Sequence, residues 1–267
     1  MIDSHCHLDA PEFNGDIDTV LAQAAQAGIS HLVNPAVAVG NFQAVKALSK
    51  HGAVLHKNDL SPAIYYALGI HPLFVMKARD QDIDVLRKAV LDSLEDPFFL
   101  GIGEIGLDGF DPSIDRSRQE WFFIEQLKVA ADFNLPVIMH VRHAVDSVLK
   151  QLRVYKPRSG IAHAFNGSRQ QALQLITCNM ALGFGGAMTF TRALQIRRLA
   201  VALPLEAIVL ETDSPDIAPS WVHAGRNSPS HLLAIGAVMA QLRDIPVSTL
   251  ELVTDANVRR VLPKLVV

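Results

Sequence analysis

Short apolar segments alternate along the chain with longer segments in which apolar residues recur at helical spacing. The short segments are rich in β-branched residues and predict strands over eight ranges, which are 2–5, 30–34, 65–70, 99–103, 136–140, 159–163, 180–184 and 207–211. The longer segments predict helices over 14–27, 40–50, 80–95, 116–133, 142–154, 168–177, 192–201, 228–242 and 248–260. The clearest periodicity places Phe122, Phe123 and Leu127 on one helical face.

The regular alternation of strand and helix predicts βαβ units and a parallel sheet, which is the α/β class. Eight strands with eight following helices fit a (β/α)8 TIM barrel, and 267 residues suit one such domain, spanning 1–267. An open doubly wound sheet is the alternative. No Gly-x-Gly-x-x-Gly follows an early strand, which disfavours the dinucleotide-binding form of that alternative.

Composition and charge exclude several classes of protein. No apolar run approaches the ~18 residues needed to cross a bilayer, and the start of the chain lacks a basic segment followed by an apolar one. Two cysteines make no disulfide framework, so we expect a cytoplasmic protein with no membrane association and no obligate protein partner. Since the net charge is −3, any phosphate-bearing substrate must be held locally, by metals and a few cations.

Residues that bind divalent metals close several of the predicted strands. His5 and His7 close the first strand, and because alternate residues of a strand face the same side, both imidazoles can face one cavity. Cys6 then faces away and is expected as a small buried residue. Glu104 follows the apolar run 98–103, where a carboxylate is costly unless it is metal-bound or paired in a salt bridge, the alternative reading.

His140 and His163 close the next two predicted strands, and Asp213 follows the last. Each alone has the alternative role of a hydrogen-bonded core residue. The strand ends of a barrel converge on one face, however, so six nitrogen and oxygen donors at five strand ends predict a metal site. Six donors exceed the four of one tetrahedral site and indicate two divalent ions, for which zinc, manganese and magnesium are the candidates. Asp108, just past Glu104, either supports these donors or belongs to a loop.

Further residues are candidates for substrate binding. Arg142 and Arg226 can hold phosphate oxygens, with a surface salt bridge as the alternative for both. His71 can contact a phosphate or support the metal donors, and its alternative role is to cap the turn that follows it. Phe165 and Phe190 can stack on a base, with packing as the alternative.

Seven stretches form an ordered pattern along nearly the whole chain: I-D-S-H-C-H-L-D (2–9), A-L-G-I-H-P (67–72), G-E-I-G-L-D (103–108), L-P-V-I-M-H-V-R (135–142), H-A-F-N-G-S (163–168), L-E-T-D-S-P (210–215) and R-N-S-P (226–229). The pattern resembles the TatD-related metal-dependent hydrolases, within the amidohydrolase-like barrels. The resemblance implies a (β/α)8 barrel with a divalent-metal site. It also implies cleavage of phosphodiester bonds in nucleic acids, notably as a deoxyribonuclease.

The resemblance also implies roles for the six donors. One cation would lie on three residues near the first and last strands, which are His5, His7 and Asp213. The other would lie on His140 and His163, with Glu104 bridging the two cations. Asp213 would also orient the attacking water or take its proton, so Asp213 and Glu104 are the predicted catalytic residues.

The chain departs from the family pattern at positions outside the proposed donors. Gly109-Phe110 stands where an aromatic residue often follows the aspartate directly, and Asn166 replaces a common serine. Leu73 follows the His-Pro pair where a second histidine is frequent, and the segment 221–225 is poor in basic residues. These departures bear on how substrate is held rather than on hydrolysis.

The sequence thus predicts a metal-dependent hydrolase that acts on ester bonds with a two-metal-activated water and takes a nucleic-acid or phosphodiester substrate. Two alternatives stay open. The same site could polarise the carbonyl of a small amide or ester, as in amidohydrolases. The barrel could also bind metal without catalysing a reaction.

Overall fold

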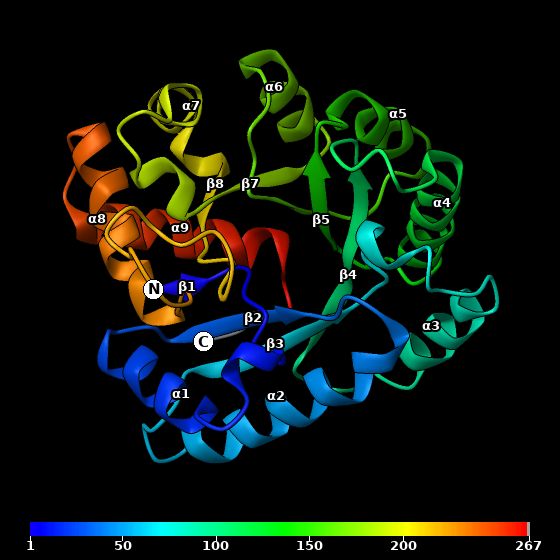
Figure 1. The fold of residues 1–267 in the computed structure, drawn as a ribbon, viewed down its shortest axis with the longest axis horizontal. Helices are drawn as coiled ribbons and strands as arrows, with labels where there is room; N and C mark the ends of the chain where they lie inside the picture. The colour runs from blue at the N-terminus through cyan, green and yellow to red at the C-terminus, as the bar shows by residue number, and fades with distance from the viewer. Residues whose placement is uncertain (266–267) are drawn as a thin grey trace.

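The computed structural model describes residues 1–265, so the last two residues of the predicted domain 1–267 lie outside the described chain. Within it, eight strands form one parallel sheet in the order β1 to β8 (Figure 1). They are β1 (Ile2–Asp3), β2 (His31–Pro35), β3 (Ala63–Leu68), β4 (Phe99–Asp108), β5 (Val137–Arg142), β6 (Gly160–His163), β7 (Met180–Phe184) and β8 (Ile208–Leu210). Because sequential strands are neighbours throughout, the sheet curls into the predicted barrel.

Helices follow the strands and surround the barrel (Figure 1). They are α1 (Ile17–Gln26), α2 (Phe42–His56), α3 (Asp82–Leu91), α4 (Arg116–Asp132), α5 (Val145–Tyr155), α6 (Arg169–Thr177), α7 (Leu194–Ala202), α8 (Leu232–Arg243) and α9 (Val247–Val261). Short 3-10 helices are η1 (Pro11–Phe13), η2 (Val39–Asn41), η3 (Pro72–Phe74), η4 (Gly186–Thr189), η5 (Leu205–Ala207) and η6 (Pro229–His231). In residues 1–265, none of the helices has both the length and the apolar character to span a bilayer.

The seam between β8 and β1 is joined by individual hydrogen bonds rather than by a regular ladder. The backbone N–H of Ser4 donates to the carbonyl of Leu210 at 3.0 Å. The buried carboxylate of Asp3 accepts from the backbone N–H of Thr212 at 3.0 Å and from its hydroxyl at 2.6 Å. These bonds explain why β1 ends at Asp3, two residues earlier than predicted, and they hold the segments after β1 and β8 together.

The barrel interior is filled by branched and small side chains, which include Ile2, Val33, Ala67, Ile138, Ile161, Ala181 and Val209. Helix α9 packs Val258 and Val261 against this interior. It lies at the amino ends of the strands, since Asp255 of α9 accepts from the backbone N–H of Ile2 at 2.9 Å. One end of the barrel is therefore sealed, and the carboxyl ends of the strands are left for polar side chains.

The predicted face of α4 is confirmed, because Phe122, Phe123 and Leu127 are all fully buried. Cys6 is likewise buried in the main hydrophobic cluster, as expected for a packing residue. Strand β4 is longer than predicted and continues through Glu104 to Asp108. Its pairing with β5 shifts register between Ile102 and Ile105, and this irregularity redirects the residues that lie between them.

Candidate metal centre

The six predicted donors lie together at the carboxyl ends of the strands. They come from the segment after β1 (His5 and His7), from β4 (Glu104), β5 (His140) and β6 (His163), and from the segment after β8 (Asp213). Among the described residues, three overlapping groups have ligand atoms within 4.8 Å of one another, namely His5–Glu104–His163, His5–His7–Asp213 and His71–Glu104–His140. The convergence of strand ends in a barrel explains how residues so distant in sequence meet.

One oxygen of Glu104 faces the residues after β1 and β8. Its Oε2 lies 3.2 Å from Nε2 of His5 and 3.3 Å from Nε2 of His7. The Oδ1 atom of Asp213 is 3.5 Å and 3.7 Å from the same two nitrogens. Asp213 is held there because its backbone N–H donates to the carbonyl of His5 at 2.9 Å, and its φ of 56° lies in the left-handed region.

The other oxygen of Glu104 faces a second set of imidazoles. Its Oε1 lies 2.8 Å from Nε2 of His163, 3.2 Å from Nε2 of His71 and 3.4 Å from Nδ1 of His140. The parallel register pairs His140 directly with His163 on β5 and β6. The single carboxylate of Glu104 thus separates two groups of donors.

Close backbone packing carries Glu104 toward the barrel axis. Its N–H donates to the carbonyl of Ala36, just beyond β2, at 2.8 Å. Glycine is required at position 69, where a Cβ would lie 2.7 Å from the carbonyl carbon of Gly103, and at position 103, where a Cβ would lie 2.8 Å from the Cβ of Ile138. The strand irregularity and the two glycines together place the buried carboxylate at the centre of the site.

Burial and charge act in opposite directions on the two central carboxylates. Burial alone would raise the pKa of Glu104, but the imidazoles of His71, His163 and His5 outweigh it and hold that pKa well below its usual range. For Asp213, burial dominates over the lowering effect of His163 and His7 and raises the pKa to about 6. Glu104 is therefore the firmly ionised centre of the cluster.

The donor set fits divalent cations. Glu104 Oε1 lies close to three imidazoles yet has no hydrogen bond within residues 1–265, although it is buried. The Nε2 atoms of His5 and His7 lie 3.1 Å apart and both face Glu104 Oε2. Buried lone pairs that converge without partners are costly, and a cation between them would satisfy them. Imidazole and carboxylate donors suit zinc and manganese, and magnesium less readily.

His71 combines the two roles considered for it. Its Nδ1 caps η3 by accepting from the backbone N–H of Leu73 at 3.1 Å, so the ring proton lies on Nε2, beside Glu104. An Nε2 that carries a proton has no lone pair for a cation. His71 therefore presents a protonated nitrogen toward Glu104 Oε1, 3.2 Å away, and is distinct from the six metal-ligand candidates.

Asp108 orients one of the candidate ligands. Its Oδ2 lies 2.9 Å from Nε2 of His140, which leaves Nδ1 of that ring facing Glu104. Burial raises the pKa of Asp108, but the bonds from His140 and from the backbone of Phe110 outweigh it and lower the pKa to about 2. The Nη1 atom of Arg142 is 3.9 Å from the same oxygen, and 49% of that side chain is exposed. Arg142 thus lies at the rim of the site.

Arg226 forms a salt bridge and Phe165 packs in the core, which are the alternative roles considered for them. The guanidinium of Arg226 bonds the carbonyl of Glu12, pairs with Asp16 at 2.5 Å and covers the ring of Phe13 at 4.5 Å. These contacts join the loop after β8 to the loop after β1. Phe165 is fully buried and presents no face to a base.

Glu211 is a buried residue of the site that the sequence interpretation passed over. Its Oε1 accepts from the backbone N–H of Ala164 at 2.5 Å and lies 3.8 Å from Nδ1 of His163. Glu211 follows the apolar run 207–210, which is the same signal that singled out Glu104.

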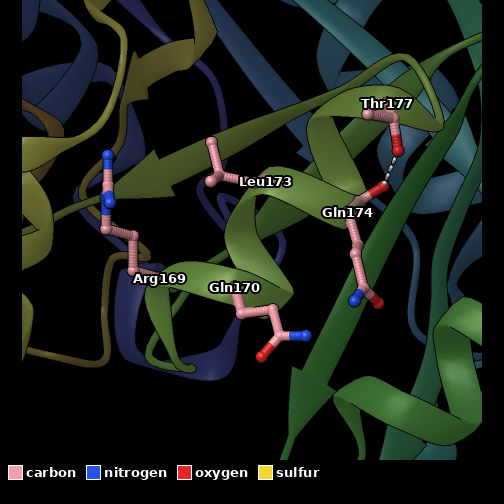
Figure 2. A pocket seen from close by; sticks show the side chains of 5 residues that line it. All are labelled: Arg169, Gln170, Leu173, Gln174 and Thr177. Carbon is pink, nitrogen blue, oxygen red and sulfur yellow. Dashed lines mark hydrogen bonds between the residues drawn. The ribbon is translucent and has the colours of Figure 1, made fainter.

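Two surface hollows differ in their relation to the cluster. One, of about 330 Å³, is lined by Arg169, Gln170, Leu173, Gln174 and Thr177, all from helix α6 (Figure 2). It holds no metal-binding side chain, and Thr177 bonds the carbonyl of Gln174 within the helix at 2.7 Å. The other, of about 410 Å³, lies where α5 and α6 begin, next to the ends of β5 and β6. The second hollow therefore lies at the same end of the barrel as the donors, with His143 and Asn166 each three residues beyond a donor in the chain.

A parallel eight-stranded barrel with histidine and carboxylate donors at its carboxyl end defines the class of metal-dependent barrel hydrolases. The model of the family described as TatD related DNase matches residues 2–263. The chain belongs to this TatD-related family of metal-dependent hydrolases.

Individual relatives match this chain over nearly their whole lengths. The metal-dependent hydrolase YjjV of Escherichia coli is 37% identical over 246 residues, covering 92% of this chain and 91% of that protein. The human deoxyribonuclease TATDN3 is 32% identical over 278 residues, covering 99% and 95%. The crystal structure of YjjV superposes with a TM-score of 0.91 at 34% identity, covering 98% of each chain. The fold predicted from the sequence is thereby confirmed.

Proposed function

We propose that the protein hydrolyses phosphodiester bonds of nucleic acid with two divalent cations held by His5, His7, Glu104, His140, His163 and Asp213. The observation that carries the proposal is the division of donors by Glu104, whose two carboxylate oxygens face separate sets of residues. The naming of the relative TATDN3 as a deoxyribonuclease supports phosphodiesters as the substrate class.

When bound, the cations would lower the pKa of a water and neutralise charge on the phosphate oxygens. The chain supplies the remaining functions. Asp213, beside His5 and His7, takes the proton of the attacking water. Glu104 lies between the two groups of donors and contacts both. His71 offers its Nε2 proton toward the same centre, and Asp108 keeps His140 in the tautomer that presents Nδ1.

A substrate panel tests this proposal. The protein is loaded with magnesium, manganese or zinc and offered a single-stranded DNA oligonucleotide, bis-p-nitrophenyl phosphate, a carboxylic ester and a cyclic amide. We expect metal-dependent cleavage of the two phosphodiesters, lost in Glu104→Gln. Turnover of only the carbonyl substrates would overturn the proposal in favour of an amide or ester hydrolase. Metal binding without any turnover would favour a non-catalytic barrel.

A further inference from the structure

An aromatic ring and a guanidinium stand together at the rim, outside the donor cluster. Phe110, in the loop after β4, is 57% exposed. The guanidinium of Arg142 lies 3.7 Å from the centroid of its ring, and the ring of His143 lies 5.7 Å away. The backbone N–H of Gly109 donates to the carbonyl of Arg142 at 2.7 Å, so the loop after β4 is fastened to the end of β5. We name Phe110, Arg142 and His143 the rim platform.

A single carboxylate connects the rim platform to the metal centre. Asp108 accepts from the backbone N–H of Phe110 at 2.7 Å through Oδ1 and contacts His140 at 2.9 Å through Oδ2. Arg142 is two residues from His140 on the same strand and 3.9 Å from Oδ2 of Asp108. The side chain of Asp108 thus links the platform residue Phe110 directly to the donor His140.

The platform borders the hollow of about 410 Å³, which His143 also lines. The side chains of Ser147, Asn166 and Asp146 line the same hollow, and Gln171 there is already hydrogen-bonded to Ser168 and Asp146. In the described chain, helix α5 begins there without a side-chain cap. Donors and acceptors of this kind suit the sugar, phosphate and base edges of a nucleotide, whereas an apolar substrate would leave them unpaired.

We propose that the rim platform and this hollow bind the nucleotide that adjoins the scissile phosphodiester, with its base on Phe110 and its phosphate on Arg142. An exposed aromatic face stacks on any base, and a guanidinium pairs with phosphate oxygens. Bases in a duplex are already stacked on their neighbours, so the platform selects single-stranded nucleic acid. This inference rests on the proposed phosphodiesterase function and adds the residues that hold the nucleotide beside the scissile bond.

The test measures binding separately from cleavage. A fluorescent single-stranded oligonucleotide is titrated, in EDTA, into the wild type and into Phe110→Ala, Phe110→Trp and Arg142→Gln. We expect Phe110→Ala to raise Kd roughly 5- to 150-fold, the range of one base–aromatic stack, and Phe110→Trp to restore it. Arg142→Gln should lower the slope of log Kd against log salt by about 0.7, the value for one phosphate contact to a single strand.

Trp121→Ala is the matched control, because Trp121 is an exposed aromatic residue (38%) on α4 that packs against Phe122. It should leave Kd unchanged. Equal Kd values for the wild type, Phe110→Ala and Arg142→Gln would overturn the platform, as would tighter binding of duplex than of single strand. The proposed function fails separately, if the metal-loaded wild type cleaves neither the oligonucleotide nor bis-p-nitrophenyl phosphate. With cleavage present, Phe110→Ala should raise KM for the oligonucleotide, whereas Trp121→Ala should leave that KM and bis-p-nitrophenyl phosphate hydrolysis unchanged.

Discussion

At the scale of single residues, the tautomers of the histidines decide which groups can serve as ligands. His71 accepts a backbone N–H at Nδ1 and must carry its proton on Nε2, whereas His140 has Nε2 on Asp108 and presents Nδ1. Two imidazoles that both face Glu104 therefore have different functions. Sequence alone cannot separate them, because each tautomer is set by a contact that forms only in the folded chain.

Asp108 provides a test at this scale. We expect Asp108→Asn to weaken metal binding about 10- to 100-fold, because the neutral amide no longer fixes the orientation and tautomer of His140. Titration of manganese followed by calorimetry measures the change. Asp111→Asn is the control, since within residues 1–265 the Asp111 carboxylate accepts hydrogen bonds from Ser113 alone, and its backbone bond to Asp108 is kept in the variant. It should leave affinity unchanged. Equal affinities for the two variants would show that Asp108 does not act through His140.

At the scale of elements, strand ends position the donors and glycines allow the strands to approach. Strand and helix periods predict the order of elements, because each element buries one face or stripe. The length of β4 could not be predicted from the pattern, since its irregularity depends on contacts with Ala36 and β5. The same limitation applies to Arg226, whose direction is decided by Asp16 and Phe13, more than 200 residues away.

Gly106 tests how tightly β4 and β5 are matched. Its φ is 144°, and a Cβ there would lie 2.0 Å from the carbonyl oxygen of His140. We expect Gly106→Ala to lower the free energy of unfolding by about 3 kcal/mol or more, measured by urea denaturation. Gly40→Ala is the control, because apart from the adjoining backbone no heavy atom of residues 1–265 lies within 4 Å of a Cβ at that position. Its change should stay within about 0.5 kcal/mol, and similar losses in both variants would contradict the account.

At the scale of the whole molecule, the site depends on the closure of the barrel. Segments after β1 and β8 meet through Asp3 and Thr212, and the donors of five strands converge only when this seam is formed. The convergence was predictable, because all strands of a parallel barrel end on one face. The rim was not, since loops such as 109–115 and 143–144 carry no periodic pattern that predicts their conformation.

Metal binding should therefore stabilise the entire fold. At a metal concentration 100 times Kd, linkage predicts about 2.7 kcal/mol of added stability, or a rise in Tm of roughly 5–10 °C. Thermal unfolding with EDTA and with manganese measures this rise. Glu104→Gln should show less than half of it, because its amide nitrogen cannot ligate. An unchanged Tm in the wild type would show that the cations do not bind the folded site.

If Glu104 divides two cation sites, anomalous diffraction from crystals soaked in manganese will locate both of them. We expect two anomalous peaks, one among Glu104, His5, His7 and Asp213 and one among Glu104, His140 and His163. Crystals of Glu104→Gln should lose at least one of them. A single peak in the wild type, or peaks that do not contact Glu104, would contradict the two-cation site.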